Sequence, residues 1–581
     1  MQFDRKPMVG WYDVKQLLAT GIKAVVSIVF GNYSDKREIQ AFAVWEDPYD
    51  FSQRDEVWID YISDLGDGFN STYTLAHLMA QHEIAVDNTI LKRGDLLIMG
   101  GDEVYPTPEK IEYKNRLQGP YNAAFPWKKD EPKTQKPKLF AIPGNHDWYD
   151  GLTNFMRLFC QGRALGNWLT MQKRSYFALK LPHNYWLIGI DIQLQGDIDE
   201  PQKAYFKRIA RKKFKEGDKV IMCTAEPSWV YASLTGEHEA DQRLRYFIDH
   251  ILKGEDEDYF NGKNKNLHIS AILTGDLHHY SRYETSEHDA GQKTQLITAG
   301  GGGAFMHPTH MLKDNIELAQ GSSATLKNEF PAKKQSRKLS WRNLLFPFYN
   351  WSMCIFLGTF HLLTSWFIQS TTKNPYGNSF METGSGMEMS FSNVDNYLHM
   401  IMDSIKHSPT VLLLNLLLLG GILFFTDTNN GGKKWNYILG LGHSILQLAN
   451  LYGCIWLFSR WNLHYLSLPV DSILQILLFT GEMILIGGLV SGVIFGLYFL
   501  VSIRIFKIHP NEAFSSFRHE GFKNFLRIHL TKEKLTIYPI GLKTVTKNWR
   551  NVGTREKPRF EGSAITYSLI ETEPIEIYHT S

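Results

Sequence analysis

The stretch Leu139-Phe-Ala-Ile-Pro-Gly-Asn-His-Asp147 places a short apolar run directly before a turn that carries an amide, an imidazole and a carboxylate. Short apolar runs closed by turn signals are typical of buried strands. Five further runs end in the same way: Glu56–Ile62 before SDLGDG, Asp95–Met99 before GGDEVY, Trp186–Ile190 before Asp191, Val220–Cys223 before TAEPSW, and His268–Leu273 before TGDLHHYS. Helical patterns such as Ser71–His82 lie between them. Because α/β sheets build their sites at the carboxyl ends of strands, the pattern predicts an α/β domain with one polar edge.

The composition excludes several protein classes. At 581 residues, a prior of roughly one domain per 150 residues allows about three or four units. Aromatic residues at 13% and charged residues at 21% exclude a disordered or collagen-like chain. The formal net charge of +2 is too small to attract the phosphate backbone of a nucleic acid, so no nucleic acid is expected as a partner. Four scattered cysteines without a CxxC pair argue against a disulfide scaffold or a zinc ribbon, and they favour a reducing compartment.

The second half of the chain holds long apolar stretches. A helix needs about 20 apolar residues to cross a ~30 Å hydrocarbon layer. Four stretches free of Asp, Glu, Lys and Arg meet this need or come close to it: Asn343–Ile368, Ser408–Thr426, Trp435–Ser459 and Met483–Ile503. The sequence therefore predicts an integral, multi-pass membrane protein with about four helices. Buried helices of a large soluble domain are the alternative interpretation.

These patterns divide the chain into four expected parts. They are a catalytic domain over 1–320, a basic linker over 321–342, a transmembrane region over 343–503 and a small β-rich tail over 504–581 that either completes the catalytic sheet or stands alone. Basic residues gather on one side of the stretches: Lys333, Lys334, Arg337, Lys338, Arg342, Lys433, Lys434, Arg504 and Lys507. Since basic loops stay in the cytoplasm, both termini and the catalytic domain are expected there. The N-terminus lacks the apolar core of a secretory signal.

Four turns carry metal-ligand chemistry in one order along the chain. They are Asp64-Leu-Gly66, Gly101-Asp102-Glu-Val-Tyr105, Gly144-Asn145-His146-Asp147 and Gly275-Asp276-Leu-His278. Each turn alone is a weak signal, because Gly-Asp after a strand is usually only a turn. Together they supply the hard oxygen and imidazole ligands that two divalent metals need. Two metals ~3.5–4 Å apart generate hydroxide and clamp an in-line phosphoryl displacement.

This series resembles the calcineurin-like metallophosphoesterase superfamily, whose signature is D-x-H or D-x-G, GD, GNH(D/E), a lone His and then GHxH. The similarity covers roughly residues 55–310. It implies a four-layer αββα sandwich with a dimetal site at one edge. By this resemblance, Asp64 and His278 are expected to bind one metal, Asn145 the second, and Asp102 both as the bridging ligand. His146 is expected to contact the phosphate and to assist the leaving oxygen, and Asp147 is expected to orient His146.

The sequence departs from the family pattern at three places. Gly66 replaces the His of D-x-H, as in the purple-acid-phosphatase branch, so Tyr105 is either a phenolate ligand or a packing ring. Asp276 stands where the first His of GHxH belongs, and a carboxylate there shifts the preference from Zn²⁺ towards Mn²⁺ or Mg²⁺. The lone His is missing; strict register aligns Ala225 with it, but Glu226 is favoured as the ligand.

Four other residues are weaker candidates for the site. Asp67 either ligates a metal or hydrogen-bonds the glycine turn. His279 faces substrate or the surface. His307 and His310 follow the Gly300–Gly303 run, which lets backbone approach a ligand closely; a turn with two surface histidines is the alternative.

The functional hypothesis is a membrane-anchored dimetal phosphoesterase that hydrolyses a phosphomonoester, phosphodiester or pyrophosphate by metal-hydroxide attack. Two divalent ions are expected, with Mn²⁺ favoured and Mg²⁺, Fe or Zn²⁺ as alternatives. The membrane attachment makes a lipid-linked substrate reasonable. One rival is a catalytically inactive sensor or scaffold of the same fold that regulates the membrane region. Another is a transporter or lipid-handling role of the spans, where His361, His443 and Glu482 are ionisable, although no buried charge ladder is evident in the sequence.

Overall fold

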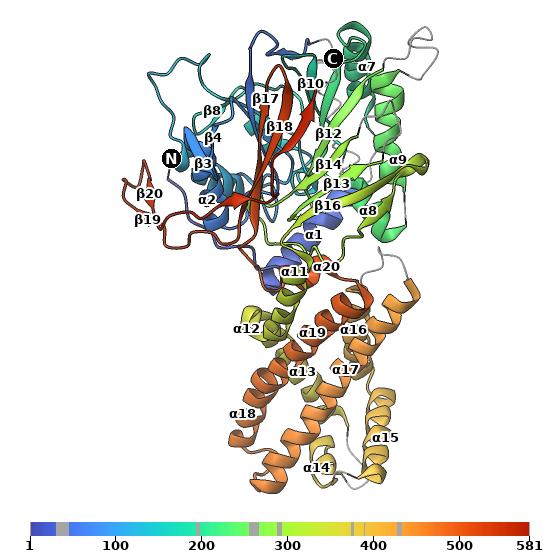
Figure 1. Cartoon of the computed structure of the whole chain (residues 1–581). Coiled ribbons are helices and arrows are strands. Elements are labelled where there is room, and N and C mark those ends of the chain that lie inside the picture. The colour runs from blue at the N-terminus through green and yellow to red at the C-terminus, as the bar shows by residue number, and fades with distance from the viewer. Residues whose placement is uncertain are drawn as a thin grey trace. The chain divides into compact units, whose positions relative to one another are not determined.

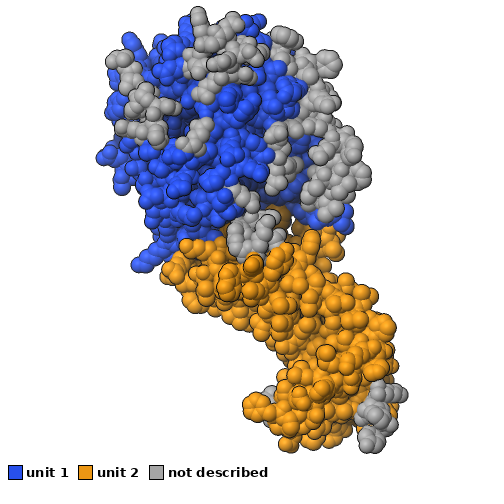
Figure 2. Space-filling view, turned by 90° about the vertical axis from the view of Figure 1, so that its right-hand side faces the viewer, with its two compact units in different colours: residues 1–9, 19–336, 518–581 blue, residues 10–18, 337–517 orange. Residues whose placement is uncertain are grey.

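The computed structural model describes residues 2–30, 46–192, 198–236, 238–254, 266–286, 293–372, 377–388, 390–426 and 433–579. The chain forms two compact units (Figures 1 and 2). Unit 1 comprises residues 1–9, 19–336 and 518–581, and unit 2 comprises 10–18 and 337–517. Unit 2 is therefore inserted into the chain of unit 1, which resumes after it. Helix α1 (Val14–Phe30) runs across the boundary at residue 18.

The first large sheet of unit 1 has nine strands. Their spatial order is β1 (Tyr49–Asp50), β9 (Phe177–Lys180), β10 (Tyr185–Gly189), β11 (Lys219–Cys223), β12 (His268–Thr274), β14 (Gln295–Ala299), β13 (Tyr280–Thr285), β16 (Ser323–Phe330) and β15 (Asn315–Glu317). Strands β10, β11, β12 and β14 are mutually parallel, so their carboxyl ends meet at one edge.

The second sheet also has nine strands. Their order is β21 (Ser568–Leu569), β18 (Lys534–Leu542), β17 (Lys523–Leu530), β2 (Val57–Ile62), β5 (Leu96–Met99), β6 (Lys138–Ala141), β8 (Trp168–Thr170) and β7 (Ala164–Leu165), with β22 (Ile575–Tyr578) paired to β18. Strands β2, β5, β6 and β8 are parallel. Two hairpins stand apart, β3 (Glu83–Val86) with β4 (Thr89–Lys92), and β19 (Arg550–Asn551) with β20 (Phe560–Glu561).

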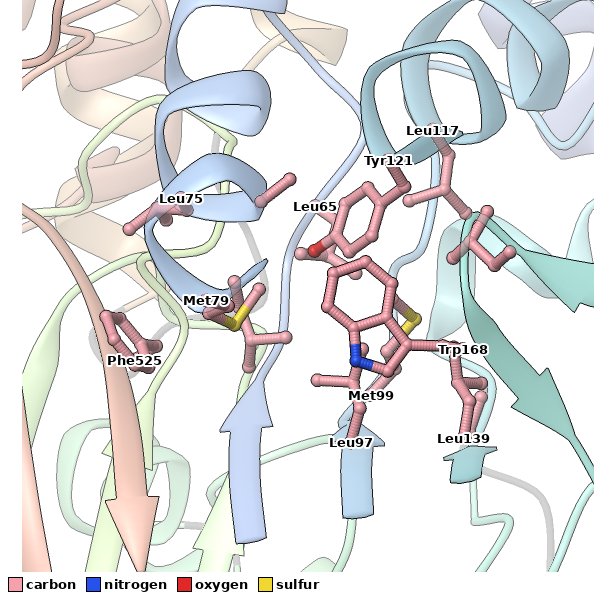
Figure 3. Packing of buried hydrophobic residues seen from close by; sticks show 14 of the residues in the cluster. Leu65, Leu75, Met79, Leu97, Met99, Leu117, Tyr121, Leu139, Trp168 and Phe525 are labelled. Carbon is pink, nitrogen blue, oxygen red and sulfur yellow. The ribbon is translucent and has the colours of Figure 1, made fainter. Parts of the chain in front are cut away.

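The two sheets pack face to face and each carries helices on its outer face. Apolar side chains of both sheets, such as Ile59, Phe140, Leu187 and Leu273, form one buried cluster between them. Outside the second sheet lie α2 (Phe69–Ala80), α3 (Lys110–Glu112), the π-helical segment η3 (Tyr113–Gln118), α4 (Gly119–Ala124), α5 (Asn145–Trp148) and α6 (Thr153–Phe159). Figure 3 shows Leu75 and Met79 of α2, Leu117 of η3 and Tyr121 of α4 packed over the strands of this sheet. Outside the first lie α7 (Glu200–Lys212), α8 (Ser228–Thr235), α9 (Glu239–Tyr246) and the π-helical segment η4 (Phe247–Lys253). The predicted αββα sandwich is confirmed.

The residues after unit 2 are part of the sandwich of unit 1. Strand β17 pairs antiparallel with β2 over Leu526–Leu530 and with β18 on its other side. The β-rich tail thus completes the second sheet. Its strand β17 lies beside β2, the strand that ends just before Asp64.

The segment expected to be a linker, 321–342, differs from that expectation. Its first part is β16, which pairs with β13 and β15, and its second part is α11 (Lys333–Leu339). The polar composition suggested a linker because β16 is near the sheet edge, where alternate side chains face solvent.

Unit 2 is helical. Its elements are η6 (Ser340–Leu345), α12 (Phe346–Tyr349), α13 (Trp351–Thr371), α14 (Phe380–Ser385), α15 (Phe391–His407), α16 (Pro409–Phe424), α17 (Lys433–Ser459), η7 (Arg460–Tyr465), α18 (Ile473–Gly481), η8 (Glu482–Gly487), α19 (Gly488–Val501), η9 (Ser502–Phe506) and α20 (Pro510–Ser515). Three helices of the described chain are long and apolar enough to cross a membrane: Trp351–Thr371, Lys434–Tyr465 and Ile473–Phe506. A fourth crossing exists if α15 and α16, bent by 107° against each other, count as one span.

The helix pair α13 and α19 packs closely through glycine. A Cβ at Gly488 would lie 2.2 Å from the carbonyl oxygen of Cys354, and one at Gly358 would lie 2.2 Å from that of Ile484. Only glycine permits this approach, which is the usual way apolar helices associate in a membrane.

Candidate metal centre

The candidate residues come from turns at the carboxyl ends of parallel strands in both sheets. Asp64 follows β2, Asp102 follows β5, and Asn145 follows β6 in the second sheet. Glu226 follows β11 and Asp276 follows β12 in the first sheet. The turns interlock: the Asp276 backbone N–H donates to both carboxylate oxygens of Asp64, at 3.1 and 2.9 Å. Residues 212 positions apart are thus joined where the two sheets meet.

Three of the candidate ligands sit on strained backbone. Asp64, Asp102 and Asp276 have φ of 58°, 52° and 65°, in the left-handed region that most side chains avoid. Two glycines make room for them. A Cβ at Gly144 would lie 2.1 Å from Asp102 Oδ1, and a Cβ at Gly275 would lie 2.6 Å from Asp64 Oδ2. The positive φ values of the aspartates and the two glycines together allow the carboxylates to approach one another.

The phenol oxygen of Tyr105 lies at the centre of this group. Its distances are 3.1 Å to Asp64 Oδ1, 2.9 Å to Asp102 Oδ2 and 3.0 Å to His278 Nε2. All three partners are acceptors, whereas a phenol has one proton to donate. The group as it stands is therefore short of positive charge, and a cation or further protons would relieve it.

The hydrogen bonds of two histidines fix which ring nitrogen is available. Nδ1 of His278 lies 2.8 Å from the Phe305 carbonyl oxygen, and Nδ1 of His146 lies 2.9 Å from that of Pro106. A carbonyl only accepts, so in both rings Nδ1 carries the proton and Nε2 presents a lone pair. A metal-ligating histidine is usually held in this way.

Asp147 does not hold the His146 ring. Its Oδ2 accepts from the backbone N–H groups of Glu103, at 3.1 Å, and Gly144, at 2.9 Å, while its Oδ1 accepts from the Tyr113 hydroxyl. The expected orienting carboxylate instead ties the two turns together, and the Pro106 carbonyl orients the imidazole. The His146 backbone N–H donates to Asp102 Oδ1 at 2.8 Å, which secures the bridging candidate.

Burial and mutual repulsion shift the carboxyl pKa values. Burial raises the pKa of Asp102 to about 7, and the charge of Asp276 adds to the shift. Burial, followed by Asp102, raises the pKa of Asp64, and burial raises that of Asp276. Burial also lowers the pKa of His146 to about 4. Perturbed carboxyls clustered at a turn edge are typical of a functional site.

The other side of the cluster is built around Asp276. The Tyr231 hydroxyl, on α8, donates to Asp276 Oδ2. Glu226 is close enough that burial and then Asp276 raise its pKa to about 7. Ala225, which strict register aligned with the missing histidine, has its Cβ 3.0 Å from where a Cβ of Gly101 would lie. Of the two adjacent residues, Glu226 carries the oxygen donors.

The residues fit a metal centre chemically, although not as finished ligands. Within the described part of the chain, no group of three or more His, Cys, Asp or Glu is placed to hold an ion directly. The separations around Tyr105 are hydrogen-bond lengths between its phenol oxygen and the candidate ligands. However, Oδ1 of Asn145 is buried without a hydrogen-bond partner, as an amide oxygen awaiting a cation would be. That orphaned acceptor and the excess of acceptors at Tyr105 both fit a bound cation.

The weaker candidates separate into near and distant residues. His307 is 7% exposed and its ring stacks on that of His278 with centroids 4.0 Å apart. His279 is 1% exposed, so it does not face the surface. Asp67 Oδ1 accepts from the Val9 N–H at 2.6 Å and lies 3.8 Å from Arg116 Nη1, whereas its Oδ2 is buried without a hydrogen-bond partner. His310 is held by Ser336, with Nδ1 2.8 Å from Oγ.

Sequence reasoning did not identify three residues beside the centre. Tyr231 contacts Asp276, Glu103 is a fully buried carboxyl with no hydrogen-bond partner for either oxygen, and Lys523 is a fully buried lysine from β17. Glu103 lies within the quoted GDEVY turn, so its charge next to Asp102 was a usable signal. Tyr231 and Lys523 have no such signal, since only the fold brings α8 and β17 to this edge.

Comparison with known proteins supports the resemblance over the same region. Residues 57–280 match the model of the calcineurin-like phosphoesterase family, which confirms the resemblance for this part of the chain. No curated protein matches the sequence at a significant level. A solved structure described as GAP50, the anchor in the inner membrane complex of Plasmodium, is similar with 13% identity, a TM-score of 0.30, and coverage of 47% of this chain and 79% of that one. PhoD is similar with 12% identity, a TM-score of 0.26, and coverage of 44% and 59%.

Proposed function

We propose that this calcineurin-like phosphoesterase domain is a metal-dependent phosphoesterase held at a membrane by unit 2. The observation that carries the proposal is the convergence of Asp64, Asp102 and His278 on one point, with too few protons to satisfy them. A structural cluster would include a lysine or arginine counter-charge. Among the described residues, no ion pair of these two carboxylates with Lys or Arg occurs, and the only pairing is Asp64 with His278 at 3.6 Å.

Two divalent ions would be held by different residues. Asp64, Asp102 and His278 would hold one, and Asp102, Asn145, Asp276 and Glu226 would hold the other. When bound, the ions supply an activated water and neutralise the phosphate oxygens. Mn²⁺ or Mg²⁺ suits this oxygen-rich set better than Zn²⁺.

His146 is the proton carrier of the proposed reaction. Its Nδ1 proton is engaged by Pro106, so Nε2 first accepts a proton and then gives it to the leaving oxygen. Burial disfavours the charged ring, since the pKa is lowered to about 4 in the metal-free protein. The negative charge of a bound phosphate ester favours that charged form, so protonation would accompany substrate binding.

The test is hydrolysis of bis-p-nitrophenyl phosphate by the detergent-purified full chain with Mn²⁺. Asp102→Asn is expected to lower the rate by about a thousandfold or more, because it removes the bridging carboxylate. Asp87→Asn, in the turn between β3 and β4, is the matched control and should keep the wild-type rate. Absence of turnover with every divalent ion, together with absence of bound metal, would favour the inactive scaffold.

We propose four membrane crossings, with unit 1 in the cytoplasm. Strands β2 and β17 flank unit 2 in the sequence and pair in one sheet, so the chain must leave and return on the same side. An even number of crossings requires α15 and α16 to act as one bent span. The basic residues before α13 and after α19 favour the cytoplasmic side. In sealed, right-side-out vesicles, tags at both termini should be protected from added protease. Cleavage of either tag would contradict the proposal.

The substrate class we propose is a lipid-linked phosphate ester. The support is the covalent attachment of unit 1 to an apolar helical unit. Turnover of phosphatidyl esters in mixed micelles, compared with soluble monoesters, diesters and pyrophosphates, tests the proposal. Equal or better turnover of the soluble esters would contradict it.

A further inference from the structure

Unit 2 has a polar face inside its apolar helices. On α17, His443, Gln447, Asn450 and Cys454 follow one another at intervals of four, three and four residues, which places them on one side of the helix. His443 is 2% exposed, Gln447 is fully buried and Cys454 is 7% exposed. The opposite face carries Tyr437, Ile438, Leu441 and Ile445, all highly exposed. The polar side chains therefore point into the bundle and the apolar ones point out.

The polar face of α17 meets α19. The Gln447 amide donates to the Ser491 carbonyl at 3.2 Å, and the Asn450 amide donates to the Ser491 hydroxyl at 2.9 Å. The His443 ring stacks on Tyr498 with centroids 4.3 Å apart, and its Nε2 lies 3.2 Å from the Gln447 amide. Between Cys454 and Tyr498, polar groups thus follow one another along the helix pair without a gap of more than one turn, and about two turns separate Cys454 from the next polar side chain of the row, Asn462.

Both ends of this row are ionisable. At one end, the Tyr498 hydroxyl lies 2.9 Å from His509 Nε2, and His509 Nδ1 lies 3.5 Å from Glu512. At the other end, Asn462 donates to Glu482 at 2.8 Å. Residues 482 and 498 are separated by about 24 Å along a helix, which is most of a hydrocarbon layer. Glu482 also begins η8, a π-helical segment of the kind often found at functional sites.

His361 on α13 adds a third helix to the row. It is fully buried, and neither of its ring nitrogens has a hydrogen-bond partner. A Cβ placed on Gly487 would lie 3.7 Å from His361 Nδ1 and 3.8 Å from Cys454 Sγ, at ordinary contact distance. A methyl group on Gly487 would therefore touch both the imidazole and the thiol.

Helix packing alone does not account for these groups. Interhelical hydrogen bonds explain Asn450 and the amide nitrogen of Gln447. They leave Nδ1 of His443, Oε1 of Gln447 and both nitrogens of His361 without partners. A buried polar group that is left unpaired destabilises the fold. Water molecules along the row would satisfy them.

We propose that unit 2 conducts protons along this row, which we call the polar row: Glu482, Asn462, His361, Cys454, Asn450, Ser491, Gln447, His443, Tyr498, His509 and Glu512. Imidazole, phenol, thiol and carboxyl groups exchange protons, and amide and hydroxyl groups hold water between them. The row has no Lys, Arg or Asp, and its two carboxyls stand at its ends, so it offers neither a cage for a metal cation nor a site for an anion. Intramembrane ionisable residues are characteristic of such relays.

This inference depends on the membrane placement proposed above and not on the phosphoesterase activity. The test uses the full chain in sealed liposomes that contain a pH-sensitive dye, with a potassium diffusion potential set by valinomycin. Wild-type vesicles are expected to change internal pH faster than protein-free vesicles. Asp102→Asn should conduct like wild type, which separates the two activities.

Gly487→Ala is the sharpest variant, because its methyl group would contact both His361 and Cys454 without a clash and so displace water held beside them. Its flux is expected to fall to the level of protein-free vesicles. Gly481→Ala is the matched control, since a methyl group there has no atom within 4 Å and should leave flux unchanged. His361→Leu should also abolish flux, with thermal unfolding used to check that it folds. Wild-type flux no faster than in protein-free vesicles, or normal flux in Gly487→Ala, would overturn the proposal and leave the polar row as helix packing.

Discussion

Arg527 donates two hydrogen bonds to Asp60, from Nε at 2.7 Å and from Nη2 at 3.0 Å, and both side chains are at most 1% exposed. The two residues are 467 positions apart, one on β2 before the helices α13 to α19 and the other on β17 after them. The Gly94 N–H also donates to Asp60, at 3.1 Å, and Arg527 donates to the Leu91 carbonyl. A bidentate buried pair with further partners fixes the register of the two strands.

Removing one member of this pair leaves an uncompensated buried charge. Arg527→Ala is expected to destabilise unit 1 by about 3–5 kcal/mol. Lys92→Ala breaks the exposed pair with Glu56, at 3.1 Å, and should cost only about 0–1 kcal/mol. Unfolding of both variants in detergent, followed by tryptophan fluorescence, measures the difference. Equal free energies of unfolding for the two variants would show that the pair of Arg527 and Asp60 does not stabilise unit 1.

Unit 1 should fold without unit 2 if its two parts are joined. A chain of residues 46–336 linked by a short flexible segment to 518–579 keeps β17 beside β2, and we expect soluble protein with cooperative unfolding. Residues 46–336 alone expose β2 as an open edge and lose the apolar cover of Phe525, Leu526 and Ile528, so we expect aggregation. Soluble yield and circular dichroism compare the two. Equal yields would contradict a structural role for the returning strands.

Tyr105 matters most when the site is empty of metal. In EDTA, Tyr105→Phe leaves Asp64, Asp102 and His278 without their shared donor, and a loss of about 1–3 kcal/mol is expected. With saturating Mn²⁺ the ion supplies the positive charge, so the loss should be smaller. Thermal unfolding in both conditions measures the two losses. A larger loss in Mn²⁺ than in EDTA would identify the phenolate as a metal ligand instead.

The metal-free protein should become less stable as pH rises. The folded-state pKa values of Asp102 and Glu226 are raised to about 7. A carboxyl with a raised folded pKa stabilises the fold while protonated and loses that contribution between its unfolded value of about 4 and its folded value. In EDTA, the melting temperature should therefore fall from about pH 5 to about pH 8, with a smaller fall in Glu226→Gln. Added Mn²⁺ should reverse the trend, since it binds the ionised carboxylates.

Tyr231 should affect metal affinity through Asp276. Its hydroxyl donates to Asp276 Oδ2, so Tyr231→Phe frees that carboxylate to rotate. A loss of about tenfold in Mn²⁺ affinity is expected, as for other groups that orient a ligand. Isothermal titration calorimetry measures it, with Tyr246→Phe as the control because that ring is 47% exposed. Unchanged affinity in Tyr231→Phe would remove it from the site.

The parts of the fold set by local patterns were predictable. Buried strands such as Leu96–Met99 are short apolar runs that end in Gly-Asp turns, so both the strand and its polar end are visible in the sequence. The convergence of Asp64, Asp102 and Asp276 followed from the order of those turns. Their positive φ values were not predictable, because no local sequence pattern shows which aspartates adopt the left-handed backbone conformation.

The misplaced boundaries have a different origin. Strand β16 is polar because it lies near an edge, and composition alone cannot distinguish such a strand from a linker. Asp147 was expected to orient His146, but a carboxylate buried between two turns gains more from two backbone N–H groups than from one ring. Residues such as Tyr231 come to the site through long-range packing, which a single sequence does not encode in any local pattern.

The insertion of unit 2 between β16 and β17 has a consequence for biosynthesis. A ribosome completes residues 46–336 while the second sheet still lacks β17 and β18, and it synthesises the helices α12 to α20 before those strands emerge. The edge of β2, which leads to Asp64, stays open throughout this interval. Nascent chains therefore cannot assemble the site before the helices of unit 2 have been made. With the proposed four crossings, a chain whose helices are inserted wrongly during translation would leave its last strands on the wrong side of the membrane, and such a chain would never complete the second sheet.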